Sequence, residues 1–138
     1  KRFIEADEFD RGLRNVMNYG HSFGHAIESA TGFGIPHGIS VTIGMDMANH
    51  IAAARGLLDL GYRDAVHKVC RKNYEDSLGV PIPLGALLEA LSRDKKNVGT
   101  SVNLILPSGA EAGMEKVAVD IDEEFRRQCQ EFLEGLLR

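Results

Sequence analysis

Apolar residues recur at spacings of three and four over the first two thirds of the chain, which is the period of an amphipathic α-helix. This pattern predicts helices over residues 10–31, 37–54, 62–78 and 84–93. Glycine and proline interrupt helices, and they stand between these segments. The interrupting residues are Gly32, Gly34, Pro36, Gly56, Gly79, Pro81 and Pro83. The first two thirds are therefore expected to be helical.

The last third changes its pattern. Two short β-rich segments, SVNLILP from Ser101 and MEKVAV from Met114, are separated by a glycine-containing turn and predict a β-hairpin. An amphipathic helix is expected from Asp122, with Glu123 and Glu124 in its first turn, where carboxylates favour the helix dipole. The predicted fold class is mainly α, as one helix-rich domain over residues 1–138 with a small β-hairpin.

Composition excludes several classes of protein. The chain has 138 residues, 43% of them hydrophobic, which is enough for a buried core. Its net charge of −4 and lack of a basic run argue against a nucleic-acid partner, and no apolar stretch is long enough for a membrane. Cys70 and Cys129 form no CxxC motif and suit a reducing, cytoplasmic location. Because position 1 is Lys rather than Met, we expect a piece of a longer protein.

The first predicted helix carries one unusual polar stripe. At 100° per residue, six polar side chains fall within about 40° of one line along the helix. They are Asp10, Arg14, Asn18, His21, His25 and Glu28, and the opposite face holds Val16, Phe23, Ile27 and Ala30. A solvated face is the ordinary explanation, but such faces are usually built from Lys and Glu rather than from Asn and His. The stripe is therefore a candidate functional surface.

Two glycines inside the same helix point to a close contact. Gly20 and Gly24 each cost about 1 kcal/mol relative to alanine in a helix interior. Their spacing of one turn indicates that another backbone, or a ligand, approaches the helix there.

Histidines supply the candidate metal chemistry. His21 and His25 lie one helical turn apart and could hold a divalent metal, and His37 follows in the segment GIPHG. Catalytic zinc takes three protein ligands, and spacing alone leaves open which two of these histidines bind and what the third ligand is. His50 and His67 have no partner at ligand spacing and are interpreted as structural.

Several blocks of the sequence resemble the C-terminal domain of the 3-dehydroquinate synthase family. In order they are GLR at 12–14, NYGHSFGHAIE at 18–28, PHG at 36–38, IGM at 43–45, RDKK at 93–96 and LILP at 104–107. The resemblance implies a helical domain with a small β-hairpin. It also implies an N-terminal NAD-binding domain outside this sequence, with the active site between the two.

The resemblance assigns roles by matching position. His21 and His37 correspond to metal ligands, and a glutamate upstream of Lys1 would be the third. The matching catalytic residues are His25, Asn18 and Arg14. The matching substrate-binding residues are Arg14, Asn18, His25, Asp10 and one of Lys95 and Lys96.

The implied activity is that of a phosphate-eliminating cyclase, a carbon–oxygen lyase of the shikimate pathway and aromatic amino acid biosynthesis. Such an enzyme converts 3-deoxy-arabino-heptulosonate 7-phosphate to 3-dehydroquinate and phosphate, using NAD and Zn²⁺ or Co²⁺. The implied partners are the sugar phosphate, the protein's own NAD-binding domain and a second copy in a homodimer. By itself the chain is expected to fold, to bind metal weakly and to be inactive.

Two departures from the family pattern keep other activities open. The family usually has Glu at the position of Asp10, and Glu-Ala-Val where this chain has Ile39-Ser40-Val41. Both concern the substrate more than the chemistry, and a sibling cyclase acting on another sugar phosphate is the alternative. A metal-dependent alcohol or glycerol dehydrogenase also carries HxxxH followed by PHG, and a non-catalytic helical module is a further alternative.

Overall fold

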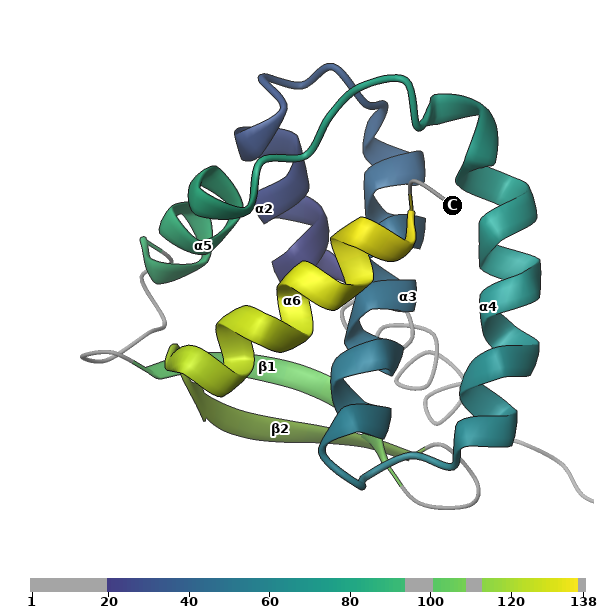
Figure 1. Ribbon diagram of the computed structural model, residues 1–138, viewed down its shortest axis with the longest axis vertical. Helices are drawn as coiled ribbons and strands as arrows, with labels where there is room; N and C mark the ends of the chain where they lie inside the picture. Colours follow the sequence, from purple (N-terminus) through teal and green to yellow (C-terminus); the bar gives the residue numbers. More distant parts are fainter. Residues whose placement is uncertain (1–19, 94–100, 109–112, 137–138) are drawn as a thin grey trace, which may run out of the picture.

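The structure, a computed structural model, describes residues 20–93, 101–108 and 113–136 (Figure 1). Its elements are α2 (His21–Ala30), α3 (His37–Ala54), α4 (Leu60–Tyr74), the 3₁₀ helix η1 (Glu75–Ser77), α5 (Leu84–Ser92), β1 (Ser101–Ser108), β2 (Gly113–Asp120) and α6 (Glu123–Gly135). The described part of the chain is thus mainly α with a two-stranded antiparallel sheet, which confirms the predicted fold class.

Helix α3 lies at the centre of the fold. It packs against α2, α4, β1 and α6, and Figure 1 shows α4 on one side of it while α6 crosses in front. Ile43, Met47 and Ile51 follow one another at spacings of four along α3 and are fully buried. A helix that is covered by several neighbours needs apolar residues on more than one side. Helix α3 has the predicted bounds, 37–54.

Three other helices differ from their predicted bounds, and of these α5 ends at Ser92, one residue early. Helix α4 begins at Leu60, two residues early, because the Asp59 carboxylate accepts a hydrogen bond from the Tyr62 backbone N–H (3.1 Å) and caps its first turn. The α-helix ends at Tyr74, and the residues up to Ser77 form η1. Helix α2 ends at Ala30, one residue before the predicted end, and residues 10–19 of the predicted first helix lie outside the described residues.

Glycines bring α2 and α3 unusually close together. A Cβ on Gly44 would collide with the carbonyl oxygen of Gly20 and lie 2.7 Å from the backbone nitrogen of Gly24. A Cβ on Gly20 would lie 2.7 Å from the carbonyl oxygen of Val41. The close contact predicted at Gly20 and Gly24 is therefore with another backbone, that of α3.

The hairpin and α6 contribute further residues to the hydrophobic core. Strand β1 pairs with β2 in the register Leu104↔Val117, and Leu104 is buried. Helix α6 is capped by Asp122, which accepts a hydrogen bond from the Phe125 backbone N–H (2.9 Å). Cys129 on α6 is buried and free, as is Cys70 on α4.

None of the helices in the described residues has both the length and the hydropathy that a membrane span requires.

Candidate functional site

Three histidine rings meet where α2 faces the beginning of α3. His21 and His25 lie one turn apart on α2, and His37 is the first residue of α3. The ring centroid of His21 is 5.4 Å from that of His25 and 5.8 Å from that of His37, and the other pair is 6.0 Å apart. We call these three residues the histidine cluster. Because Pro36 and the glycine contact fix the start of α3 against α2, His37 on α3 becomes a neighbour of His21 and His25 on α2.

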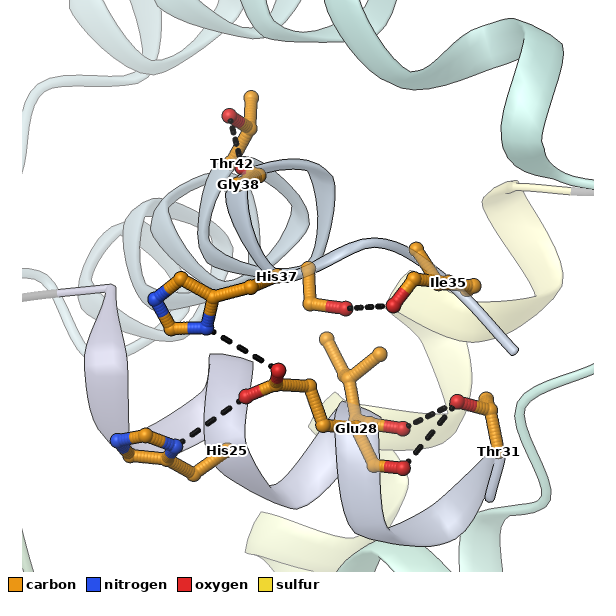
Figure 2. A network of polar contacts seen from close by, with 9 residues as sticks. His25, Glu28, Thr31, Ile35, His37, Gly38 and Thr42 are labelled. Carbon is orange, nitrogen blue, oxygen red and sulfur yellow. Dashed lines mark hydrogen bonds and ion pairs between the residues drawn. The ribbon is translucent and has the colours of Figure 1, made fainter. Parts of the chain in front are cut away.

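A buried carboxylate underlies the cluster. Glu28 Oε1 lies 3.2 Å from His25 Nδ1, and Glu28 Oε2 lies 3.1 Å from His37 Nδ1. The Glu28 side chain is 9% exposed, whereas those of His25 and His37 are 68% and 58% exposed. Figure 2 shows the Glu28 carboxylate between the two imidazoles, with their other ring nitrogens directed away from it. Within the polar stripe, the Glu28 side chain is therefore nearly buried, whereas the His25 side chain is exposed to solvent.

The electrostatics of the cluster favour an uncharged ring at His21. Partial burial, followed by the nearby charges of His25 and His37, holds the pKa of His21 below its ordinary value, and Glu28 acts in the opposite direction. A metal ligand must present an unprotonated nitrogen, so a lowered pKa suits His21 to that role.

The donor set is nevertheless incomplete for a metal within this part of the chain. Among the described residues, no group of three or more His, Cys, Asp or Glu side chains is arranged to hold a metal ion. Catalytic zinc needs three protein ligands. The described residues therefore do not complete a catalytic zinc site by themselves.

A hollow beside His25 brings in a residue that had no predicted role. It has a volume of about 470 Å³ and lies between α2 and α5, where Ser22, Ser29 and Arg93 line it together with His25. The Arg93 side chain is 63% exposed, and its guanidinium lies 4.0 Å from Glu89 Oε1. Hydroxyl and guanidinium groups can donate hydrogen bonds to a phosphorylated sugar, and an imidazole nitrogen can donate or accept one according to its tautomer. The sequence feature that could have pointed to Arg93 is its position in the RDKK block.

The other predicted site residues lie outside the described part of the chain: Asp10, Arg14, Asn18, Lys95 and Lys96. Of the eight residues predicted for the site, the structure brings together His21, His25 and His37. Glu28 belonged to the predicted stripe but carried no predicted role.

The two histidines interpreted as structural have contacts that spacing did not reveal. His67 Nδ1 lies 2.7 Å from Asp46 Oδ2, which also accepts a hydrogen bond from the Tyr74 hydroxyl (2.6 Å). His50 Nε2 lies 3.9 Å from Glu131 Oε1. Asp46 and Tyr74 are buried, so these contacts support a structural role for His67.

Comparison with known proteins gives consistent matches. Residues 1–97 match the family described as 3-dehydroquinate synthase C-terminal. The chain is 33% identical over 135 residues to the 3-dehydroquinate synthase of Streptococcus sanguinis (strain SK36), covering 93% of this chain and 37% of that protein. It is 33% identical over 130 residues to the enzyme of Lactococcus lactis subsp. cremoris (strain MG1363), covering 93% and 36%. The chain thus spans about a third of the length of these relatives.

A solved structure shares the fold. It is a 2-deoxy-scyllo-inosose synthase in complex with carbaglucose-6-phosphate, NAD+ and Co2+, with a TM-score of 0.65 and 24% sequence identity. The match covers 85% of this chain and 34% of that one.

Proposed function

Because the chain belongs to the 3-dehydroquinate synthase C-terminal family, we propose that it forms the metal- and substrate-binding part of a 3-dehydroquinate synthase. The reaction is the conversion of 3-deoxy-arabino-heptulosonate 7-phosphate to 3-dehydroquinate and phosphate. The observation that carries the proposal is the convergence of His21, His25 and His37 over Glu28 at the α2–α3 contact. These are the histidines that the sequence motif requires.

His21 and His37 hold the metal in this proposal, and the third ligand comes from a segment preceding residue 1. When bound, Zn²⁺ or Co²⁺ supplies Lewis-acid stabilisation of negative charge on a substrate oxygen. His21 suits this role because its pKa is lowered, so that the ring is unprotonated near neutral pH.

His25 contacts the substrate rather than the metal. Its Nδ1 is engaged by Glu28, and its exposed ring lines the hollow between α2 and α5. There its other ring nitrogen can accept a hydrogen bond or a proton from an O–H of the phosphate. Arg93, in the same hollow, supplies a positive charge for the same group.

The remaining substrate contacts follow from the motif. Arg14 pairs its planar guanidinium with a carboxylate, Asn18 and Asp10 bind hydroxyl groups, and one of Lys95 and Lys96 contacts an anionic group. Several donors that hold one substrate in a fixed orientation lower the entropic part of the barrier.

The complete enzyme in this proposal includes an NAD-binding domain before this chain, and it works as a cytoplasmic homodimer. NAD supplies reversible hydride transfer, while the protein supplies orientation and electrostatics. Because both this domain and the third metal ligand are outside the sequence, the 138-residue chain alone is expected to be inactive and to bind metal weakly.

The departure at Ile39 is compatible with the proposal. Ile39 is half-buried and packs against the hydrophobic core. An apolar residue in that position is accommodated by packing, so it leaves the polar groups of the histidine cluster unchanged.

The test uses the longer protein that includes an NAD-binding domain, supplied with NAD, Zn²⁺ and the heptulosonate 7-phosphate. Free phosphate and NADH absorbance are followed together. We expect phosphate release without net NADH, and loss of release in His21→Ala. Phosphate released only from other sugar phosphates would indicate a sibling cyclase, and NADH accumulation without phosphate a dehydrogenase; either result contradicts the proposal.

A further inference from the structure

Glu28 is the one side chain that contacts both His25 and His37 through hydrogen bonds, within the residues that the structure describes. Its two carboxylate oxygens are divided between the two rings, at 3.2 Å and 3.1 Å. The carboxylate is nearly buried, while both rings are more than half exposed. The contact therefore anchors two exposed rings from the protein side and leaves their outer edges open.

The chemistry of the contact selects one tautomer in each ring. An ionised carboxylate can only accept hydrogen bonds, and a neutral imidazole has one donor and one acceptor nitrogen. Both rings meet Glu28 through Nδ1, so Nδ1 must carry the hydrogen and Nε2 must carry the lone pair. Figure 2 shows that the Nε2 side of each ring faces away from Glu28.

We propose that Glu28 is a positioning residue that fixes His25 and His37 in the Nδ1–H tautomer, so that both present an unprotonated Nε2 to the open face of the histidine cluster. What these nitrogens meet rests on the function proposed above: a divalent metal at His37 and, at His25, an O–H of the substrate or of its phosphate, from which Nε2 can accept a hydrogen bond or a proton. Carboxylates that orient metal-binding histidines in this way commonly raise the affinity for the metal.

The position of His37 makes this role specific to the folded chain. His25 is on α2 with Glu28, but His37 is nine residues away, at the beginning of α3. A single carboxylate thus sets the orientation of rings on two helices. His21 contacts the other two rings by stacking.

The variant Glu28→Gln distinguishes a role of Glu28 in orienting the two rings from a role in filling space. Glutamine has the same shape but offers one acceptor oxygen and one donor nitrogen. It can therefore accept from only one Nδ1–H, and its NH₂ group must donate to the other Nδ1. That second ring is forced into the Nε2–H tautomer, in which Nε2 can no longer bind a metal or accept a proton.

The experiment uses the metal-free 138-residue chain, labelled with ¹⁵N, at pH 8, above the ordinary imidazole pKa of about 6.5. Long-range ¹H–¹⁵N correlation spectra distinguish protonated from unprotonated ring nitrogens, and the single variants His25→Gln and His37→Gln assign the signals. We expect Nδ1–H at both residues in the wild type and a change of tautomer at one of them in Glu28→Gln. The control is Glu75→Gln, an exposed glutamate of η1, which should leave both tautomers unchanged.

A second measurement is zinc binding by the longer protein that includes an NAD-binding domain, in competition with a chromophoric chelator. Glu28→Gln should weaken binding by roughly 10- to 100-fold, while Glu75→Gln should not change it. An Nε2–H tautomer at either histidine in the wild type overturns the proposal. So do unchanged tautomers in Glu28→Gln; if this variant does not fold, the wild-type spectrum alone decides.

These results are independent of the activity assay. Failure to release phosphate would overturn the proposed function and leave the tautomers as they are. If the enzyme is active but its His37 carries Nε2–H, the proposed function stands and the proposed role of Glu28 is overturned.

Discussion

Two buried carboxylates on neighbouring helices each bind two side chains, yet they have different surroundings. Glu28 on α2 contacts His25 and His37, whose side chains are 68% and 58% exposed. Asp46 on α3 contacts His67, which is 37% exposed, and the fully buried hydroxyl of Tyr74. We call Asp46, His67 and Tyr74 the Asp46 network.

The difference lies in where the partners point. Asp46 joins α3 to α4 inside the protein, and burial together with the Asp46 contact raises the pKa of Tyr74 well above its ordinary range. Glu28 instead holds two rings that remain open to a ligand. The same pair of groups, a carboxylate and an imidazole, therefore fastens helices in one place and orients ligand-binding atoms in the other.

The comparison predicts a large difference in stability between two alanine variants. Asp46→Ala leaves the buried Tyr74 hydroxyl and the His67 Nδ1–H without their acceptor, and should lower the free energy of unfolding by about 3 kcal/mol. Glu28→Ala should cost only about 1 kcal/mol, because its exposed partners can turn to water. Urea unfolding of both variants measures this, and equal losses would contradict the distinction.

Gly44→Ala should disturb the Glu28 region while sparing the Asp46 network. The added methyl would meet the backbones of Gly20 and Gly24, which can yield only if α2 and α3 move apart. We expect a loss of about 2 kcal/mol in unfolding free energy and weaker zinc binding, since His37 moves with α3. The matched control is Gly38→Ala on the same helix, where a Cβ meets open space and stability should be unchanged or higher. Equal effects of the two substitutions would argue against the close contact.

Tyr74→Phe tests the Asp46 network without emptying the core. The ring stays in place, but the buried Asp46 carboxylate loses one of its two donors. Hydrogen bonds to charged groups contribute roughly 1.5–3 kcal/mol, and we expect a loss near the lower value. Tyr62→Phe, on the exposed part of the same helix, should leave the unfolding midpoint unchanged.

The smallest expected effect is a pH dependence of stability from His50. Burial, together with the charge of Arg63, lowers the pKa of His50, and Glu131 and Asp46 oppose this shift. The unfolded chain therefore binds the proton more tightly, so stability should fall as the pH decreases below about 6.5 and level off above it. Unfolding curves between pH 5.5 and 8 should show a weaker dependence in His50→Gln. An identical slope in the variant would exclude His50 as the source.

Local signals account for the elements that the sequence predicted well. Pro36 and Gly56 enclose a continuous apolar pattern, and α3 has the predicted bounds. The last helix was expected from Asp122, which is the N-cap of α6, and the helix begins at Glu123. The predicted start of α4 is two residues late because the apolar pattern begins after the turn that Asp59 caps.

The sequence by itself determined the helical class, the hairpin, the polar stripe and the set of histidines. These depend on period, turn residues and motif, all of which are contained in short stretches of chain. Only the tertiary structure decided that Glu28 joins His25 to His37 and that Asp46 joins His67 to Tyr74. The contacts of Glu28 with His37 and of Asp46 with His67 and Tyr74 connect residues on different helices. Their geometry depends on how closely α2, α3 and α4 pack, which no local pattern specifies.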